Sequence, residues 1–279
     1  MNIEHLKERI TYFSAQPTIE DKAEARSLVG EFLDALDAGA IRSAKKVEGV
    51  WKSVNWVKSG ILLTFQIGQN SIFPNEPAPF FDKDTLPLRD TKGLDFNIRI
   101  VPGGSSVRRG SFLGENVIVM PPAFVNIGAY VDDNTMIDSH ALVGSCAQIG
   151  RQVHLSAGCQ IGGVLEPIGL RPVIIEDEAL IGGNTGVFEG TLVGEGAVLA
   201  PGVQLTSATT VYDLVRQTTY SSSPGQPLTI PGGAVVVPGS RPARGDFASQ
   251  ENLQLYAPVI VKYRDDSTDA ATILEGDLR

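Results

Sequence analysis

The chain has 279 residues, enough for one large domain or two modest ones with a sizeable hydrophobic core. Hydrophobic residues make up 42% of it and charged residues 20%, which indicates a folded protein rather than a disordered one. The formal net charge of −9 argues against nucleic acid or an anionic membrane surface as the main partner. The sequence contains no apolar run long enough for a membrane-spanning helix, and its first residues lack the apolar core of a signal peptide. A cytoplasmic protein is therefore expected.

The N-terminal third of the chain mixes helical and extended patterns. Apolar residues at helical spacing predict a helix over residues 3–13. A second helix is expected to begin at Thr18, where TIED resembles a capping box, and to end at the glycine of residues 37–40. The apolar run ILLTFQIG at 61–68 reads as a strand, and the proline-rich stretch 73–87 leads away from it.

A repeat of six residues organises the middle of the chain. Its first position is aliphatic without a gap, in the series Leu113, Val119, Val125, Val131, Ile137, Val143, Ile149, Leu155 and Ile161. The phase slips by two across residues 166–173, and the series resumes as Ile175, Ile181, Val187, Val193, Leu199, Leu205 and Val211. After a polar insertion at 217–228, Ile230 and Val236 return to it. The fifth position is small, with examples in Ala123, Ala129, Thr135, Ala141 and Cys159.

A six-residue period fits neither a helix nor a single strand. It fits a short strand plus a bend, with three such units making one triangular coil of about 18 residues and the coils stacking at about 4.8 Å. The aliphatic first position would fill the interior of the prism. The pattern predicts a mainly β protein whose residues 101–240 form a parallel β-helix. Because solenoids need capped ends, residues 1–100 are expected to form an N-terminal α/β domain and residues 241–279 a C-terminal cap.

Several segments resemble the family of 2,3,4,5-tetrahydropyridine-2,6-dicarboxylate N-succinyltransferases, which act in bacterial lysine and diaminopimelate synthesis. They are VNIGAYVD (125–132), VGSCAQIG (143–150), VHLSAG (153–158), IGGVLEP (161–167), IIED (174–177), VYD (211–213), residues 35–65 and YAPVIVKYR (256–264). The resemblance spans nearly the whole chain. It implies a left-handed coil, a handedness that the repeat alone does not give, and a homotrimer with active sites in grooves between neighbouring prisms. It also implies succinyl transfer from succinyl-CoA to the amine of the opened cyclic imine, giving N-succinyl-2-amino-6-oxopimelate and CoA.

This chemistry needs a base for the attacking amine and donors for the thioester oxyanion. Asp138 matches the family's functional aspartate and is the first candidate for the base and for orienting substrate; its ordinary reading is a turn aspartate that bonds its own backbone. Where the family carries an Arg-Ser-Glu triplet, this chain has Asn184-Thr185-Gly186, so Glu189, three residues on, becomes the second catalytic candidate. His140 stands where the family has a tryptophan, and is either a general base or a surface histidine.

Binding residues follow from the same resemblance. Arg108 is expected to bind a substrate carboxylate, whereas strand alternation should turn Arg109 to the opposite face. Ser145 and Glu166 are the other candidates for substrate binding. For CoA, the candidates are the backbone of Gly163 and three cations late in the chain, Arg241, Arg244 and Lys262.

Other readings stay open. An acetyl-CoA-dependent enzyme of the same pathway step, another acyl acceptor and a non-catalytic scaffold all fit the repeat. A zinc hydratase would need three histidines around one metal. The chain has His5, His140 and His154, and His5 lies in the predicted N-terminal helix, so no metal is expected.

Overall fold

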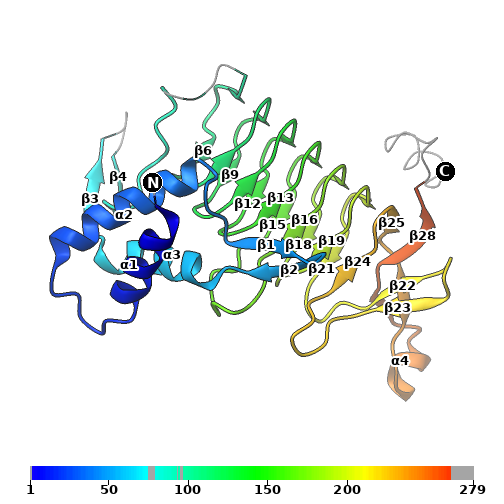
Figure 1. Cartoon of the computed structure of the whole chain (residues 1–279). Coiled ribbons are helices and arrows are strands. Elements are labelled where there is room, and N and C mark those ends of the chain that lie inside the picture. The colour runs from blue at the N-terminus through cyan, green and yellow to red at the C-terminus, as the bar shows by residue number, and fades with distance from the viewer. Residues whose placement is uncertain (1, 75–78, 93, 95–96, 265–279) are drawn as a thin grey trace.

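The computed structural model describes residues 2–74, 79–92, 94 and 97–264. Most of them form a three-sided prism of short parallel strands. Three helices pack at one end of the prism and a strand-rich cap closes the other, as Figure 1 shows. The predicted fold class, a mainly β, left-handed parallel β-helix with a helical N-terminal domain, agrees with this arrangement. No helix among the described residues is long and apolar enough to cross a membrane.

Each side of the prism is one sheet. Face A consists of β7 (Phe112–Leu113), β10 (Tyr130–Val131), β13 (Gln148–Ile149), β16 (Ile174–Ile175), β19 (Leu192–Val193) and β24 (Thr229–Ile230). Face B consists of β5 (Arg99–Ile100), β8 (Ile118–Val119), β11 (Met136–Ile137), β14 (His154–Leu155), β17 (Leu180–Ile181), β20 (Val198–Leu199) and β25 (Ala234–Val237). Face C consists of β6 (Ser106–Val107), β9 (Phe124–Val125), β12 (Leu142–Val143), β15 (Gln160–Ile161), β18 (Gly186–Val187) and β21 (Gln204–Leu205).

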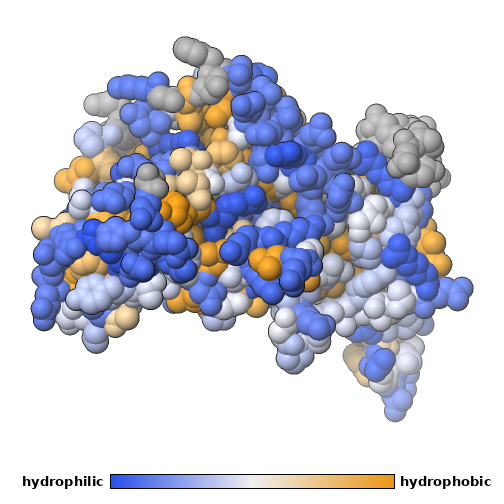
Figure 2. All heavy atoms as spheres, in the orientation of Figure 1, coloured by the Kyte–Doolittle hydropathy of each residue, from blue (hydrophilic) through white to orange (hydrophobic). Residues whose placement is uncertain are grey.

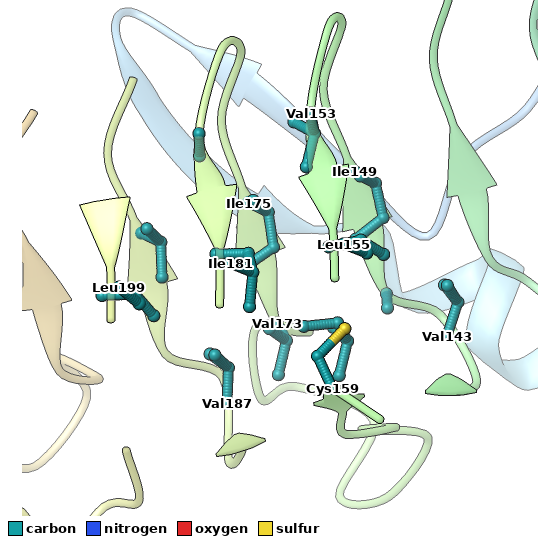
Figure 3. Packing of buried hydrophobic residues seen from close by; sticks show 14 of the residues in the cluster. Val143, Ile149, Val153, Leu155, Cys159, Val173, Ile175, Ile181, Val187 and Leu199 are labelled. Carbon is teal, nitrogen blue, oxygen red and sulfur yellow. The ribbon is translucent and has the colours of Figure 1, made fainter. Parts of the chain in front are cut away.

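The aliphatic series fills the interior of the prism, which confirms the predicted phase. The second residue of each strand points inward, and Val143, Ile149 and Ile181 are completely buried. In Figure 3, Ile149 lies near Ile175 and Leu155 near Ile181 on successive coils. The parallel register joins residues 18 apart in regular coils, as with Met136 and His154. Each coil therefore adds one aliphatic layer to a continuous core.

Two coils are longer than this register allows. Gln148 pairs with Ile174, which is 26 residues further on, so the extra residues leave the prism as a loop over 163–173. Leu192 pairs with Thr229, 37 residues further on, and the excess forms an insertion over 206–228. Val211 continues the hexad count in the sequence but lies in this insertion, where it is buried under the cap.

The N-terminal helices are α1 (Ile3–Ser14), α2 (Lys22–Asp37) and α3 (Asn55–Ile67). The prediction that the second helix begins at Thr18 is wrong. Its N-cap is Asp21, whose carboxylate accepts a hydrogen bond of 2.8 Å from the Glu24 backbone N–H.

The predicted strand at 61–68 is also wrong, because most of it is the second half of α3. Val57, Ile61 and Thr64 recur at helical spacing and are buried where α3 packs against α1 and α2. A short apolar run does not distinguish a buried helix from a buried strand. Here the helix is stabilised by the two neighbouring helices, which supply an apolar face along its whole length.

Two hairpins leave the helical domain. The first, β1 (Ala44–Val47) with β2 (Val50–Ser53), lies along face A, where Ala44 packs against Ile174 and Leu192. The second, β3 (Asn70–Phe73) with β4 (Phe80–Lys83), falls in the proline-rich stretch. Figure 2 shows this side of the molecule as mostly hydrophilic, with scattered hydrophobic areas.

The cap extends the sheet of face B. β28 (Val259–Tyr263) pairs with β25, and β22 (Val211–Asp213) and β23 (Thr218–Tyr220) follow it. Asp213 is buried and accepts hydrogen bonds from the Tyr263 hydroxyl at 2.5 Å and from two backbone N–H groups. Next to it lie β26 (Ser240–Pro242), α4 (Asp246–Gln250) and β27 (Gln254–Tyr256).

Replacing the inward Ile230 with Asp should destabilise the protein strongly, because it buries a carboxylate with no partner at a cost of several kcal/mol. The preceding residue, Thr229, points outward and is exposed, so Thr229→Asp is the matched control and should melt near the wild type. Thermal unfolding followed by circular dichroism measures both. Equal melting temperatures for the two variants would contradict the inward phase of the repeat.

Candidate functional site

Seven of the predicted site residues lie on two different edges of the prism, and the other three lie in the cap. Asp138 and His140 occupy a bend between faces B and C, the B–C edge, formed by residues 120–123, 138–141, 156–159, 182–185 and 200–203. Arg108, Ser145, Gly163, Glu166 and Glu189 occupy bends between faces C and A, the C–A edge, formed by residues 108–111, 126–129, 144–147, 162–173, 188–191 and 206–228. Because the two edges are opposite borders of face C, a single chain does not bring the two groups together.

Asp138 is half-buried at the start of its bend. Its Oδ1 accepts a hydrogen bond of 2.7 Å from the Ser139 N–H, and Asn126 and Asp132 make the same contact in their own bends. Among the described residues no group donates to Oδ2, so one carboxylate oxygen is available. Behind it lies the buried Cys159 thiol; burial, assisted by the Asp138 carboxylate, raises the pKa of Cys159 to about 12.

His140 is exposed and has a left-handed backbone, with φ of 62°. The equivalent residues of the next bends on this edge, Gly158 and Asn184, have φ of 72° and 56°. Histidine is among the residues that tolerate this region, so the bend accounts for its conformation without a catalytic role. Its backbone N–H donates to the Pro122 carbonyl at 2.5 Å, one step of the ladder that joins successive bends.

Glu189 is exposed on the C–A edge, and the insertion 206–228 holds it. Its Oε2 accepts a hydrogen bond of 2.6 Å from the Ser207 N–H. Hydrogen bonding from Ser207 keeps the pKa of Glu189 below its usual value. A carboxylate stabilised in its ionised form is a weaker proton acceptor, which counts against Glu189 as the base.

Two other predicted residues of the C–A edge, Ser145 and Gly163, lie side by side where the loop 163–173 begins. The Val164 N–H donates to the Ser145 carbonyl at 3.1 Å, and a Cβ on Gly163 would lie 2.7 Å from the Ser145 nitrogen. Ser145 and Gly163 are therefore in direct contact. Glu166 is exposed further along the same loop.

The two arginines at the start of the prism contact the N-terminal domain. Arg108 donates to Asp82 Oδ2 at 2.6 Å and to the Leu86 carbonyl at 3.2 Å, whereas Arg109 donates to Asp34 at 2.6 Å. Each guanidinium thus has an internal partner, and substrate binding by Arg108 stays a prediction. Arg241 lies in β26, Lys262 in β28 and the exposed Arg244 in between, all in the cap.

Gly186, at the position of the family's triplet glutamate, could carry a side chain only if two neighbouring side chains moved. A Cβ there would lie 2.2 Å from Gln204 Oε1 and 2.5 Å from Phe188 Cε2. The same phenyl ring covers Gly162 on the preceding coil, where a Cβ would lie 2.7 Å from Phe188 Cδ1. Phe188 and Gln204 therefore replace the glutamate as the local surface of face C. Sequence reasoning missed both residues; the available signal was Gly186 in β18 and Gly162, which directly follows the neighbouring strand β15.

A cavity of about 830 Å³ lies between β2, the loop 163–173 and residues 219–229, and Lys52, Leu170 and Arg171 are among its lining residues. It contains none of the predicted site residues. Among the described residues there is no group of three or more His, Cys, Asp or Glu side chains that could hold a metal ion.

Two family models match separate parts of the chain. One, described as the N-terminal part of tetrahydrodipicolinate N-succinyltransferase, matches residues 5–67. The other, described as the hexapeptide repeat of succinyl-transferase, matches residues 172–207. Together with the prism, these matches define a hexapeptide-repeat acyltransferase.

Curated relatives narrow this class. A protein of Acinetobacter baylyi named 2,3,4,5-tetrahydropyridine-2,6-dicarboxylate N-succinyltransferase is 43% identical over 92% of this chain and 90% of its own length. A protein of the same name from Idiomarina loihiensis is 39% identical over 99% of both chains. Another, from Polynucleobacter asymbioticus, is 43% identical over 92% of this chain and 90% of its own length. The chain belongs to the 2,3,4,5-tetrahydropyridine-2,6-dicarboxylate N-succinyltransferase family.

Gly186→Ala should lower the free energy of unfolding by about 1–3 kcal/mol, because the Phe188 ring and Gln204 must move to admit a methyl group. Gly169→Ala is the control, since nothing lies within 4 Å of its Cβ position. It should stay within about 0.5 kcal/mol of the wild type. Denaturant titration measures both, and a Gly186→Ala protein as stable as the control would refute the packing described at this position.

Both cysteines should be unreactive in the folded protein. Cys146 and Cys159 are fully buried, and burial raises their thiol pKa values to about 11 and about 12. Dithionitrobenzoate at pH 8 should therefore release no chromophore from the native protein and two equivalents after unfolding in guanidinium. Rapid reaction of either thiol in the native protein would show that its coil opens.

Proposed function

We propose that this chain transfers the succinyl group of succinyl-CoA to the amine of ring-opened tetrahydrodipicolinate, giving N-succinyl-2-amino-6-oxopimelate and CoA. The observation that carries the proposal is the extent of the match to named relatives, which reaches 99% of both chains and so includes the helical domain, the prism and the cap. A hexapeptide prism alone would support only the class of acyltransferase.

In the proposed reaction the amine nitrogen attacks the thioester carbonyl carbon. The new N–C bond forms, the C–S bond breaks, and the proton leaves the nitrogen for a carboxylate before it reaches the departing CoA sulfur. Asp138 takes this proton, a role supported by its available Oδ2 and by the lowered pKa of the alternative, Glu189. Backbone N–H groups of the bends, such as that of Gly163, are suited to stabilise the oxyanion.

The division of the site between two edges supports a homotrimer. The B–C edge of one prism would face the C–A edge of its neighbour, so that Asp138 of one chain joins Ser145, Gly163 and Glu166 of the next. Three chains of 29.7 kDa give roughly 90 kDa. The two unpaired cysteines fit a reducing compartment, and we place the enzyme in the cytoplasm.

CoA would lie along the B–C edge, with its phosphates near the cap. The Gln204 side chain bonds the Asn184 carbonyl, and its backbone N–H bonds the Tyr256 hydroxyl, which connects this edge to the β26–β27 hairpin that carries Arg241. Arg244 and Lys262 are the other cations of the cap. A CoA-release assay with tetrahydrodipicolinate, with succinyl-CoA and acetyl-CoA in parallel, tests the proposal; turnover with acetyl-CoA alone would favour the alternative donor.

Asp138→Asn should lower the turnover number by at least about a hundredfold, since a general base contributes about 10²–10⁴-fold. Asn is nearly isosteric and its oxygen can still accept from the Ser139 N–H, so melting temperature and molecular mass should not change. Glu189→Gln and His140→Gln are the companion variants. If Asp138→Asn keeps a near-normal turnover number and one companion variant loses its activity, the residue replaced in that companion is the base instead.

Mixed trimers test whether the site is shared between chains. Asp138→Asn disables the B–C edge, and Ser145→Trp blocks the C–A edge. In an equal mixture refolded together, roughly a quarter of the interfaces would combine two intact edges, so activity should return to about a quarter of the wild-type value. A site contained within one chain would leave every copy defective, and the mixture would be as inactive as its parents.

A further inference from the structure

Lys58 is a fully buried lysine that the proposed reaction does not use. It lies near the N-terminal end of α3, and its Nζ donates a hydrogen bond of 2.5 Å to the carbonyl oxygen of Leu170. Among the described residues no carboxylate lies within 4 Å of the ammonium group. The Cys146 thiol, the titratable group that acts electrostatically on Lys58, has a pKa raised to about 11 by burial and stays neutral at physiological pH.

Such a placement costs free energy, because the charged form of Lys58 loses its hydration. Burial lowers the pKa of Lys58, as expected for a charge that lacks a counter-ion. A methionine of similar length would fill the same space without this cost, at the expense of the hydrogen bond that the ammonium donates to the Leu170 carbonyl. Stability of the helical domain therefore does not explain why a lysine stands here.

What Lys58 contacts is the loop 163–173, which carries Glu166 and begins at Gly163. The Ser53 hydroxyl, from β2, donates to the Ile168 carbonyl of the same loop at 3.0 Å. Leu165 packs against the core of the helical domain, while Leu170 packs against the core of the prism. The helical domain therefore holds the loop at two backbone carbonyls and one side chain.

The far end of the loop is tied to the next coil. Arg171 donates from Nε and Nη2 to the Gly190 carbonyl at 3.1 and 2.9 Å. Gly190 follows Glu189, whose carboxylate is bonded to Ser207. A continuous series of contacts thus leads from α3 through the loop to the second candidate carboxylate of the C–A edge.

We infer that Lys58, with Ser53, is a positioning residue that fixes the loop 163–173 and so holds the C–A half of the active site in place. The loop has no strand ladder of its own between Ile161 and Ile174, and it needs partners for its carbonyl groups. An ammonium donates strongly from the end of a long side chain and reaches the loop from the helix. The helical domain would then contribute to catalysis by holding this loop, without itself contacting the reacting atoms.

The test compares Lys58→Met with Thr64→Val. Thr64 is equally buried on the same helix, but its hydroxyl bonds the Ile61 carbonyl within α3 and does not contact the loop. Three quantities are measured for each full-length protein: melting temperature, hydrogen exchange of peptides covering 163–173, and the turnover number. Lys58→Met should melt within about 3 °C of the wild type or above it. Its loop amides should exchange at least about tenfold faster, and its turnover should fall by about ten- to a hundredfold, as misplaced site groups imply.

Thr64→Val should leave loop exchange and turnover unchanged. If Lys58→Met melts much earlier, Ser53→Ala, which removes a single hydrogen bond to the loop, decides the question: it should show faster loop exchange and lower turnover at a wild-type melting temperature. Loop exchange at the wild-type rate in these variants, or faster exchange with full turnover, would overturn the inference. The rate measurement rests on the proposed function, but hydrogen exchange needs no substrate. If the wild-type protein shows no succinyl transfer, the proposed function is refuted. Hydrogen exchange of residues 163–173 then still tests whether Lys58 and Ser53 hold the loop.

Discussion

The structure depends on one geometric constraint, the stacking of an inward aliphatic side chain on its counterpart in the next coil. Ile137 above Leu155 and Ile149 above Ile175 are two instances, each in a register that the parallel strands impose. The interior is too narrow for any other kind of residue in large numbers, so it carries no chemistry. Every polar or charged group that acts must lie at an outward strand position, in a bend, in an insertion or outside the prism. Coils that depart from the regular length add surface that the regular coils lack.

Both departures from the regular length occur on the C–A edge, and both contribute to the candidate site. The eight additional residues of the coil that ends at Ile174 form the loop with Glu166, while the longer insertion supplies Ser207 to Glu189. The B–C edge, by contrast, keeps bends of regular length through Asp138, His140 and Asn184, and its ladder of backbone hydrogen bonds is continuous. One edge is rigid and repetitive and the other is elaborated. A trimer would join an edge of each kind in every groove.

Much of the prism could be predicted from the sequence, because the inward stacking of aliphatic side chains requires a period of six residues. An aliphatic residue every six positions predicts the inward series, and the small fifth positions fit the turns of the chain. The same reasoning failed for residues 61–68, since an apolar run gives no period over so short a length and only its packing against α1 and α2 makes it a helix. The start predicted at Thr18 failed because the carboxylate of Asp21, three residues on, is the group that caps the helix by accepting from the Glu24 N–H.

The candidate site was predicted only in part, because its residues are joined by contacts across the chain rather than by spacing within it. Asp138 could be found by its motif, yet nothing in the sequence reports that Ser139 occupies only one of its two oxygens. The absence of the triplet glutamate could be read at Gly186, but what occupies this place, the Phe188 ring lying over Gly162 and Gly186, required the coordinates of two successive coils. Lys58 is the extreme case. On its helix it is spaced like any residue of the buried face, and only the coordinates reveal that its ammonium contacts a loop of the C–A edge more than a hundred residues away. A residue of this kind is recognised by comparing two things: the free-energy cost of burying its charge, and the group with which that charge forms a hydrogen bond.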